Sequence, residues 1–319
     1  MSLAHVAREG INKENICGLT NGRRAGEGLS RLGGKETRSA PLLPCLASPP
    51  RAVFQSPQEA APYVDSILQH ILSREETTAR PSPDYMLAQR DINARMRSIL
   101  VDWLVDVTLK FRMRPQTLFM TVALIDRFLS AREVTRGRLQ LVGVAALMIV
   151  GKYEEIYPPL VKDYVAVCDN AYSKAEVLAM ESEMLLAFNF DLNRPSALVF
   201  LEFLRQRTEL DEKGFAFARY LLETALLDLG HLKFNSAVLA AGALFLVNKI
   251  FKREAWPARL LRATDIPEAT AKLAAKDLFD VMGRTESSSL TALRRKFADP
   301  VFFEVSKYRI ERVPSAPTL

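Results

Sequence analysis

Residues that commonly perform enzyme chemistry are scarce in this chain. It holds only three histidines, well separated in sequence, and neither the His-Glu-x-x-His zinc pattern nor a glycine-rich phosphate loop occurs. Lys152, Glu154 and Glu155 come closest to an acid/base set. Adjacent helical residues point about 100° apart, so these three side chains do not converge on one atom. The sequence therefore predicts a protein that is not an enzyme and that needs no metal or other cofactor.

The cysteines fit neither a disulfide framework nor a zinc site, because Cys17, Cys45 and Cys168 are odd in number and far apart. This pattern indicates a reducing compartment. No secretory signal is recognisable, and the longest apolar stretch, residues 141–151, is about half of what spans a bilayer. We therefore expect an intracellular, soluble protein without a membrane partner.

The positive charge is spread unevenly along the chain. The formal net charge is +6, and residues 1–50 supply half of it, with seven Lys and Arg against four Glu. The remainder is only mildly basic, whereas a nucleic-acid footprint needs Lys and Arg concentrated on one folded face. The composition therefore argues against nucleic acid as a partner.

Two groups of residues remain as candidates for binding. Lys152 lies near the end of a predicted apolar helix, where a cation either complements the helix dipole or serves a partner. In residues 90–106, an apolar stripe recurs at helical spacing, which is typical of a core helix. Asn93 is a plausible N-cap of that helix. The stripe consists of Met96, Ile99, Leu100 and Trp103.

The elements that position these residues read as successive helices, with no alternation typical of strands. One set of five is predicted near 94–112, 116–130, 137–153, 160–167 and 174–188, and a second set near 195–206, 211–228, 236–252, 255–262 and 267–283. The third helix of each set is apolar nearly all round, as a helix enclosed by its neighbours should be. The two occurrences lie roughly ninety-odd residues apart, which indicates one fold repeated in tandem.

The ends of the chain differ from this helical body. Residues 1–58 hold half of all glycines and a proline cluster, so we expect a disordered tail. Tyr63 and Ile67 lie four residues apart on one stripe of a short helix within an N-terminal segment, residues 59–92. We expect residues 301–319 to form a C-terminal extension.

Five stretches of the chain together resemble one known family. They are residues 85–105, 121–130, 138–143, 151–159 and 188–192. They resemble the A- and B-type mitotic cyclins, and residues 110–112, 193–195 and 240–243 look more B-type. The resemblance implies an all-α fold of two tandem five-helix cyclin boxes, residues 93–192 and 193–300. It also implies a regulatory subunit that binds and activates a cyclin-dependent kinase, at the G2/M transition and in mitosis.

The resemblance assigns roles to individual residues. Lys152 and Glu181 would hydrogen-bond the backbone of a kinase segment, since lysine only donates and glutamate only accepts. Apolar kinase contacts would come from Tyr153, Phe190, Tyr63 and Ile67.

Two further sets follow from the same resemblance. Arg97 and Asp126 would form a buried structural ion pair. A shallow docking groove for Arg-x-Leu motifs of substrates or inhibitors would face outward, with Asp106 meeting the arginine. Its members would be Met96, Ile99, Leu100, Trp103, Asp106, Leu139 and Gln140.

The tail carries short motifs typical of cyclins. Lys13, Glu14 and Asn15 spell a KEN box, the degron read by a mitotic ubiquitin ligase, and the overlapping residues 13–21 resemble a destruction box with conservative swaps. Ser48 precedes Pro49 in a proline-directed kinase consensus, although a solvated proline-rich linker is an equal interpretation. The family role implies localisation in nucleus and cytoplasm. The alternative function is that of a cyclin-fold transcription factor that binds nucleic acid, but such proteins usually add a zinc ribbon that this chain lacks.

Overall fold

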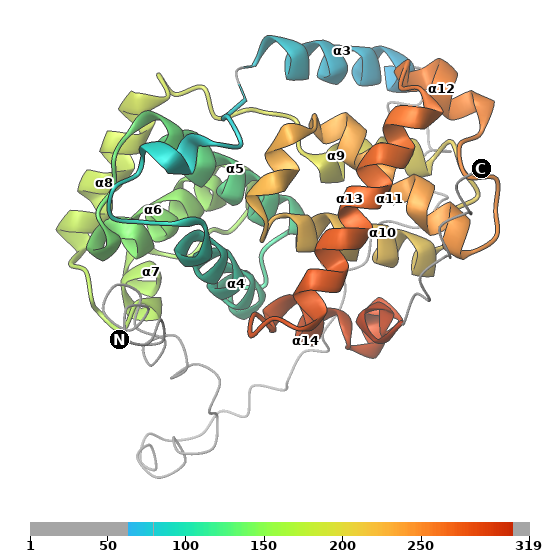
Figure 1. Cartoon of the computed structure of the whole chain (residues 1–319). Helices are drawn as coiled ribbons and strands as arrows, with labels where there is room; N and C mark the ends of the chain where they lie inside the picture. Colours follow the sequence, from blue (N-terminus) through green and yellow to red (C-terminus); the bar gives the residue numbers. More distant parts are fainter. Residues whose placement is uncertain (1–62, 79, 309–319) are drawn as a thin grey trace. The chain divides into compact units, whose positions relative to one another are not determined.

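The computed structural model describes residues 63–78 and 80–308. Within these ranges the chain forms α-helices and short 3-10 helices and no β-strand, so the predicted all-α class is confirmed (Figure 1). The described residues form two compact units. Unit one holds residues 84–193, and unit two holds residues 63–83 together with 194–308. The predicted tail, with its KEN box and Ser48, lies outside the described residues, as do residues 309–319.

Unit one contains the first predicted set of five helices. Asn93 accepts a hydrogen bond from the backbone N–H of Met96, which caps the first helix, and Ser173 with Glu176 forms a capping box on the last. The elements are η3 (Tyr85–Ala88), α4 (Ala94–Lys110), α5 (Pro115–Ala131), α6 (Arg136–Glu154), α7 (Val161–Val167) and α8 (Lys174–Ala187). Each α-helix begins and ends within about two residues of its predicted bounds.

Unit two contains the second set of five, with additional elements at both ends. The five are α9 (Ala197–Arg205), α10 (Glu212–Ala225), α11 (Ser236–Ile250), α12 (Ala258–Thr264) and α13 (Glu268–Glu286). The additions are α3 (Val64–Thr77), η4 (Leu229–Lys233), α14 (Ala292–Phe297), η5 (Pro300–Phe302) and η6 (Val305–Lys307). Helix α14 was not predicted from the sequence.

The third helix of each set is the core of its unit. Helix α6 packs against α5 and α8, and α11 packs against α9, α10 and α13. A glycine permits close approach in both. A Cβ atom at Gly143 would lie 2.7 Å from Leu100 Cδ1, and one at Gly242 would lie 2.6 Å from the Cβ of Ala274. The predicted role of small residues in close helix packing is confirmed at these two positions.

Helix α3 packs on α9 and joins unit two through polar contacts as well as through the buried Leu68. The Glu75 carboxylate accepts hydrogen bonds from the backbone N–H groups of Ser236 and Ala237 at the start of α11. A carboxylate there satisfies free donors and complements the helix dipole. None of the described helices is both long enough and apolar enough to cross a membrane.

Candidate functional site

Lys152 and Glu181 lie together on the surface of unit one. Lys152 is in the last turn of α6, and Glu181 is in the middle of α8. The Lys152 Nζ atom is 2.6 Å from Glu181 Oε1 and 2.9 Å from Oε2. The Lys152 side chain is 46% exposed and that of Glu181 13%. The structure thus brings together the two residues predicted to bind a partner's backbone.

The neighbouring glutamates have other partners. Glu154 pairs with Arg114, and burial raises the pKa of Glu154 while Arg114 opposes that rise. Glu155 accepts hydrogen bonds from the backbone N–H of Arg114 and from the hydroxyl of Thr117, at the start of α5. Helix α5 has no side-chain cap of its own, so Glu155 fulfils that role from a distance. Glu154 and Glu155 thus stabilise the fold, and only Lys152 points to a candidate binding site.

An exposed apolar group occupies the end of α6, the loop after it, and the end of α8 with its following loop. Tyr157 is 93% exposed and Ile156 85%. Large apolar side chains left in water in such numbers mark an interaction surface. The exposed apolar group consists of Tyr153, Ile156, Tyr157, Leu160, Leu186 and Phe190. Sequence reasoning had identified Tyr153 and Phe190 but missed the other four. The signal for Ile156, Tyr157 and Leu160 was an Ile-Tyr-Pro-Pro-Leu run between two helices, whereas Leu186 lies within α8 and had no such signal.

The backbone after α8 holds Phe190 outward. Asn189 and Phe190 both adopt positive φ angles, 49° and 60°, which are uncommon for residues other than glycine. The Phe190 N–H donates to the Leu185 carbonyl at 3.0 Å. Arg127 fixes the next residues, because its Nη1 donates to the Asp191 carbonyl at 2.8 Å and its guanidinium lies over the Phe188 ring. Phe188 is therefore buried, while Phe190 stays exposed.

The other two predicted apolar contacts belong to unit two, where Tyr63 is the N-cap residue of α3 and Ile67 lies within that helix. Tyr63 is exposed and Ile67 partly exposed. Both are thus available to a partner, and that part of the predicted site belongs to a different unit from Lys152.

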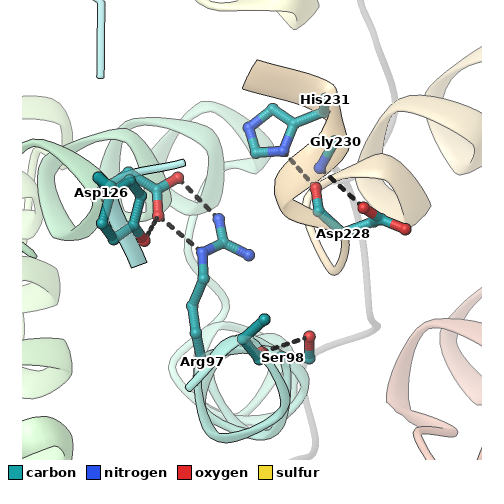
Figure 2. A network of polar contacts seen from close by, with 8 residues as sticks. Arg97, Ser98, Asp126, Asp228, Gly230 and His231 are labelled. Atoms are coloured by element: carbon teal, nitrogen blue, oxygen red, sulfur yellow. Dashed lines mark hydrogen bonds and ion pairs between the residues drawn. The ribbon is translucent and has the colours of Figure 1, made fainter. Parts of the chain in front are cut away.

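Arg97 and Asp126 form the expected buried ion pair. Nε of Arg97 lies 2.6 Å from Oδ1 of Asp126, and Nη2 lies 2.7 Å from Oδ2. Figure 2 shows this bidentate contact, and neither side chain is exposed. The Tyr85 hydroxyl also donates to Asp126 at 2.7 Å. Burial alone would lower the pKa of Arg97, but the facing carboxylate raises it above its ordinary value, so the pair remains ionised.

The docking groove was expected to face outward, and this is wrong for Leu100, Trp103, Leu139 and Gln140. Leu100, Trp103 and Leu139 are at most 1% exposed. Leu100 fills the space left by Gly143 on α6, so packing against the central helix takes it away from the surface. Trp103 is enclosed by the core as well, and its indole N–H has no acceptor among the described residues.

The other members of the docking groove are only partly accessible. Met96, Ile99 and Asp106 are partly exposed, whereas Gln140 is buried at 7% exposure. A peptide approaching this face would meet a narrower apolar surface than the sequence suggested.

The structure offers no alternative chemistry at the cysteine or at acidic clusters. Cys168 is buried, and burial raises the pKa of its thiol to about 12, which disfavours the reactive thiolate. Within the described ranges no group of His, Cys, Asp and Glu side chains has the geometry to hold a metal ion.

Comparison with known proteins identifies the class of protein. The model of the cyclin N-terminal domain matches residues 66–193, and that of the cyclin C-terminal domain matches residues 195–311. Together they span most of the chain. The chain therefore belongs to the cyclin family, and the predicted pair of cyclin boxes is confirmed. Cyclins are regulatory subunits and not enzymes, in accord with the expected lack of catalysis.

Individual relatives specify the group within the family. Putative cyclin-A3-1 of Arabidopsis thaliana is 33% identical over 315 residues, covering 94% of this chain and 87% of that protein. The G2/mitotic-specific cyclin-B2 of Gallus gallus is 38% identical over 256 residues, covering 79% of this chain and 63% of that protein. Relatives of both types make this chain a member of the A/B group of cyclins.

A solved structure supports the fold independently. The X-ray structure of a viral cyclin from herpesvirus saimiri superposes with a TM-score of 0.62 at 19% sequence identity, covering 71% of this chain and 99% of the viral one. At that identity the likeness concerns the fold alone.

Proposed function

We propose that this cyclin is the regulatory subunit of a cyclin-dependent kinase, which it binds and activates through the end of α6 in unit one. The observation that carries the proposal is the partly exposed Lys152–Glu181 pair, located in the unit that also displays the exposed apolar group. Aromatic anchors near a small polar centre are typical of binding hot spots. The cyclin names of the relatives favour this function over a nucleic-acid-binding transcription factor.

The chemistry of the pair suits a backbone partner. A lysine ammonium has three donors and a carboxylate only accepts, so the two together serve both the C=O and N–H groups of one segment. In the unbound chain two donors of Lys152 are used on Glu181. A partner's carbonyl accepts a hydrogen bond from Lys152, and the partner's N–H donates to an oxygen of Glu181, while Lys152 and Glu181 can remain in contact because each has further hydrogen-bonding capacity.

Activation is expected because the kinase segment bound by the pair would be the one that leads into the kinase's regulatory helix. Held at its backbone, the segment leading into the kinase's regulatory helix moves inward, completes the kinase's Lys–Glu ion pair and releases the activation segment. The cyclin supplies binding free energy, and the kinase supplies the chemistry.

A direct test is recovery of the partner. The full chain, captured from cycling cells, should bring down a kinase subunit that phosphorylates histone on the beads. The same capture from mitotic and interphase cells identifies the stage. Beads without kinase activity at every stage would contradict the proposed function.

We further propose that the protein acts in mitosis as a B-type cyclin, resides in nucleus and cytoplasm, and is destroyed through its tail. A degron must be reached by its ligase as an extended segment, which a tail poor in periodic apolar residues provides. Replacing Lys13, Glu14 and Asn15 by alanine should leave kinase activation intact and make the protein persist through mitotic exit. Disappearance on the normal schedule would place the degron elsewhere.

A further inference from the structure

Unit two contains a polar cavity that the kinase-binding proposal does not use. Its volume is about 540 Å³, and it lies between the loop after α9, the end of α11 and the start of α12. Three arginines line it, Arg253, Arg259 and Arg262, together with two carboxylates, Glu209 and Glu254. Positive charge is therefore in excess in its walls.

The turn after α11 holds Arg253 in place. Lys252 has a φ of 54°, and the Arg253 N–H donates to the Asn248 carbonyl at 2.8 Å. The buried Asn248 side chain donates in turn to the Ala255 carbonyl at 3.3 Å, which closes the loop. The guanidinium of Arg253 is 5.4 Å from the Phe251 ring centroid. The side chain is therefore positioned by the fold before any ligand binds.

The donors of Arg253 are only partly used. Its Nη2 lies 3.3 Å from Asp211 Oδ1, a long contact, and its Nη1 is buried with no hydrogen-bond partner within the described part of the chain. A buried donor without an acceptor costs free energy, so an acceptor that reached it would be favoured.

Arg259 and Arg262 supply charge at the mouth of the cavity. They are three residues apart on α12 and therefore project from one face of that helix. Both are exposed, and among the described residues neither forms an ion pair. Two of the three guanidinium groups form no ion pair among the described residues, and the third has an unused donor, so together they supply the positive charge and the N–H donors that an oxyanion requires.

We infer that this cavity binds a phosphoserine side chain, and that its occupant is the phosphorylated Ser48 segment of the same chain. A phosphate monoester carries about −1.5 to −2 charges and three strong acceptor oxygens, which the guanidinium groups bind bidentately. Ser48 is followed by proline in a kinase consensus, so the modification is available to a proline-directed kinase.

The attachment of the tail favours binding within the same molecule. Asp65, two residues after the first described residue, pairs with Arg207, and Arg207 adjoins two residues that line the cavity, Thr208 and Glu209. Gln69 donates to the Ala263 carbonyl on α12 at 3.3 Å. The tail therefore departs from unit two beside the cavity. Ser48 lies fifteen residues before Tyr63, a distance that an extended chain covers over roughly 50 Å.

The test uses the full chain, unphosphorylated, and a fluorescent peptide of residues 46–55 with phosphoserine at position 48. Fluorescence anisotropy should show binding that the unphosphorylated peptide lacks and that inorganic phosphate competes away. Arg259→Gln with Arg262→Gln should weaken binding at least tenfold. The matched control, Arg90→Gln with Arg132→Gln, changes two exposed arginines of unit one and should leave binding unchanged.

A second arm tests whether the tail itself is the occupant. A chain phosphorylated at Ser48 should bind the added peptide at least tenfold more weakly, because its own tail fills the cavity. Equal affinity of the phosphorylated and unphosphorylated chains overturns the assignment of Ser48. No phosphate-dependent binding, or binding unchanged by the Arg259 and Arg262 substitutions, overturns the cavity as a phosphoserine site.

Discussion

The two units share one arrangement of five helices, yet large apolar side chains in the loop after the central helix are exposed in unit one and buried in unit two. In unit one that loop exposes Ile156 and Tyr157. In unit two the corresponding loop buries Trp256, whose indole N–H donates to the Ile266 carbonyl at 3.0 Å. The aromatic residue of this loop thus completes the core in unit two, whereas Tyr157 in unit one remains exposed. The comparison teaches that repetition of a fold does not repeat the surface that its loops present.

The buried charges differ in a parallel way. Asp126 and Glu223 each occupy the twelfth position of the second helix in their set. Asp126 is neutralised by Arg97 alone, but Glu223 contacts both Arg219, at 2.7 Å, and Lys296 of α14, at 2.5 Å. Two buried cations therefore face one carboxylate, which leaves one positive charge uncompensated. Burial lowers the pKa of Lys296 to about 8 despite the attraction of Glu223. Unit two therefore uses the same position to attach an additional helix.

The largest effect should come from breaking these buried pairs. Arg97→Ala leaves Asp126 as a buried carboxylate without its cation, and Glu223→Ala leaves Arg219 and Lys296 without their anion. Each change should cost about 3–5 kcal/mol of unfolding free energy. Urea titration measures it, with Lys233→Ala plus Asp277→Ala, an exposed pair, as control. An Arg97→Ala protein as stable as the control would show that the pair does not stabilise unit one.

The second-largest effect is expected in the loops that follow the central helix of each unit. Trp256→Ala should destabilise unit two by about 3–5 kcal/mol, because it removes a buried aromatic side chain. Ile156→Ser with Tyr157→Ser should change stability by only about 0.5 kcal/mol, since both side chains are exposed, while weakening binding to the kinase. Melting curves and kinase pull-downs measured on both variants separate the two roles. Equal destabilisation by the two variants would contradict the contrast between the loops.

A smaller effect is expected at the partly exposed stripe of α4, which we propose as a docking surface for Arg-x-Leu motifs. Met96→Ala with Ile99→Ala should raise the KM for protein substrates that carry the motif, by about threefold to tenfold, and should not alter phosphorylation of a short peptide. Leu100, Trp103 and Leu139 are left intact because they belong to the core. Equal losses on both substrates would show that the stripe does not select substrates.

Helix positions were predictable where local chemistry determines them. Asn93 and the Ser173–Glu176 capping box mark helix starts in the sequence itself. The two central helices are recognisable because most of their residues are apolar. Helix α14 was missed because it is short and depends on long-range contacts, namely the Lys296–Glu223 ion pair and the burial of Phe297.

The polar residues of the candidate site were predictable from the sequence, but which of its apolar side chains are exposed was not. Helix α4 is apolar on several sides, so sequence alone does not tell which side faces water, and Leu100 is buried because Gly143 lies opposite. Likewise, Tyr157 and Trp256 are both aromatic residues in proline-containing loops. Only tertiary packing separates the exposed residue from the buried one.

The central claim is that the Lys152–Glu181 pair binds the kinase, and one measurement tests it most directly. The kinase activity stimulated by Lys152→Ala with Glu181→Ala is compared with that stimulated by wild type and by Lys233→Ala with Asp277→Ala, an exposed pair of unit two. Loss of two charge-assisted hydrogen bonds, each contributing about 1.5–3 kcal/mol, predicts at least a tenfold loss of activation, with an unchanged melting temperature. Activation within about twofold of wild type, which corresponds to less than about 0.5 kcal/mol, would contradict the claim.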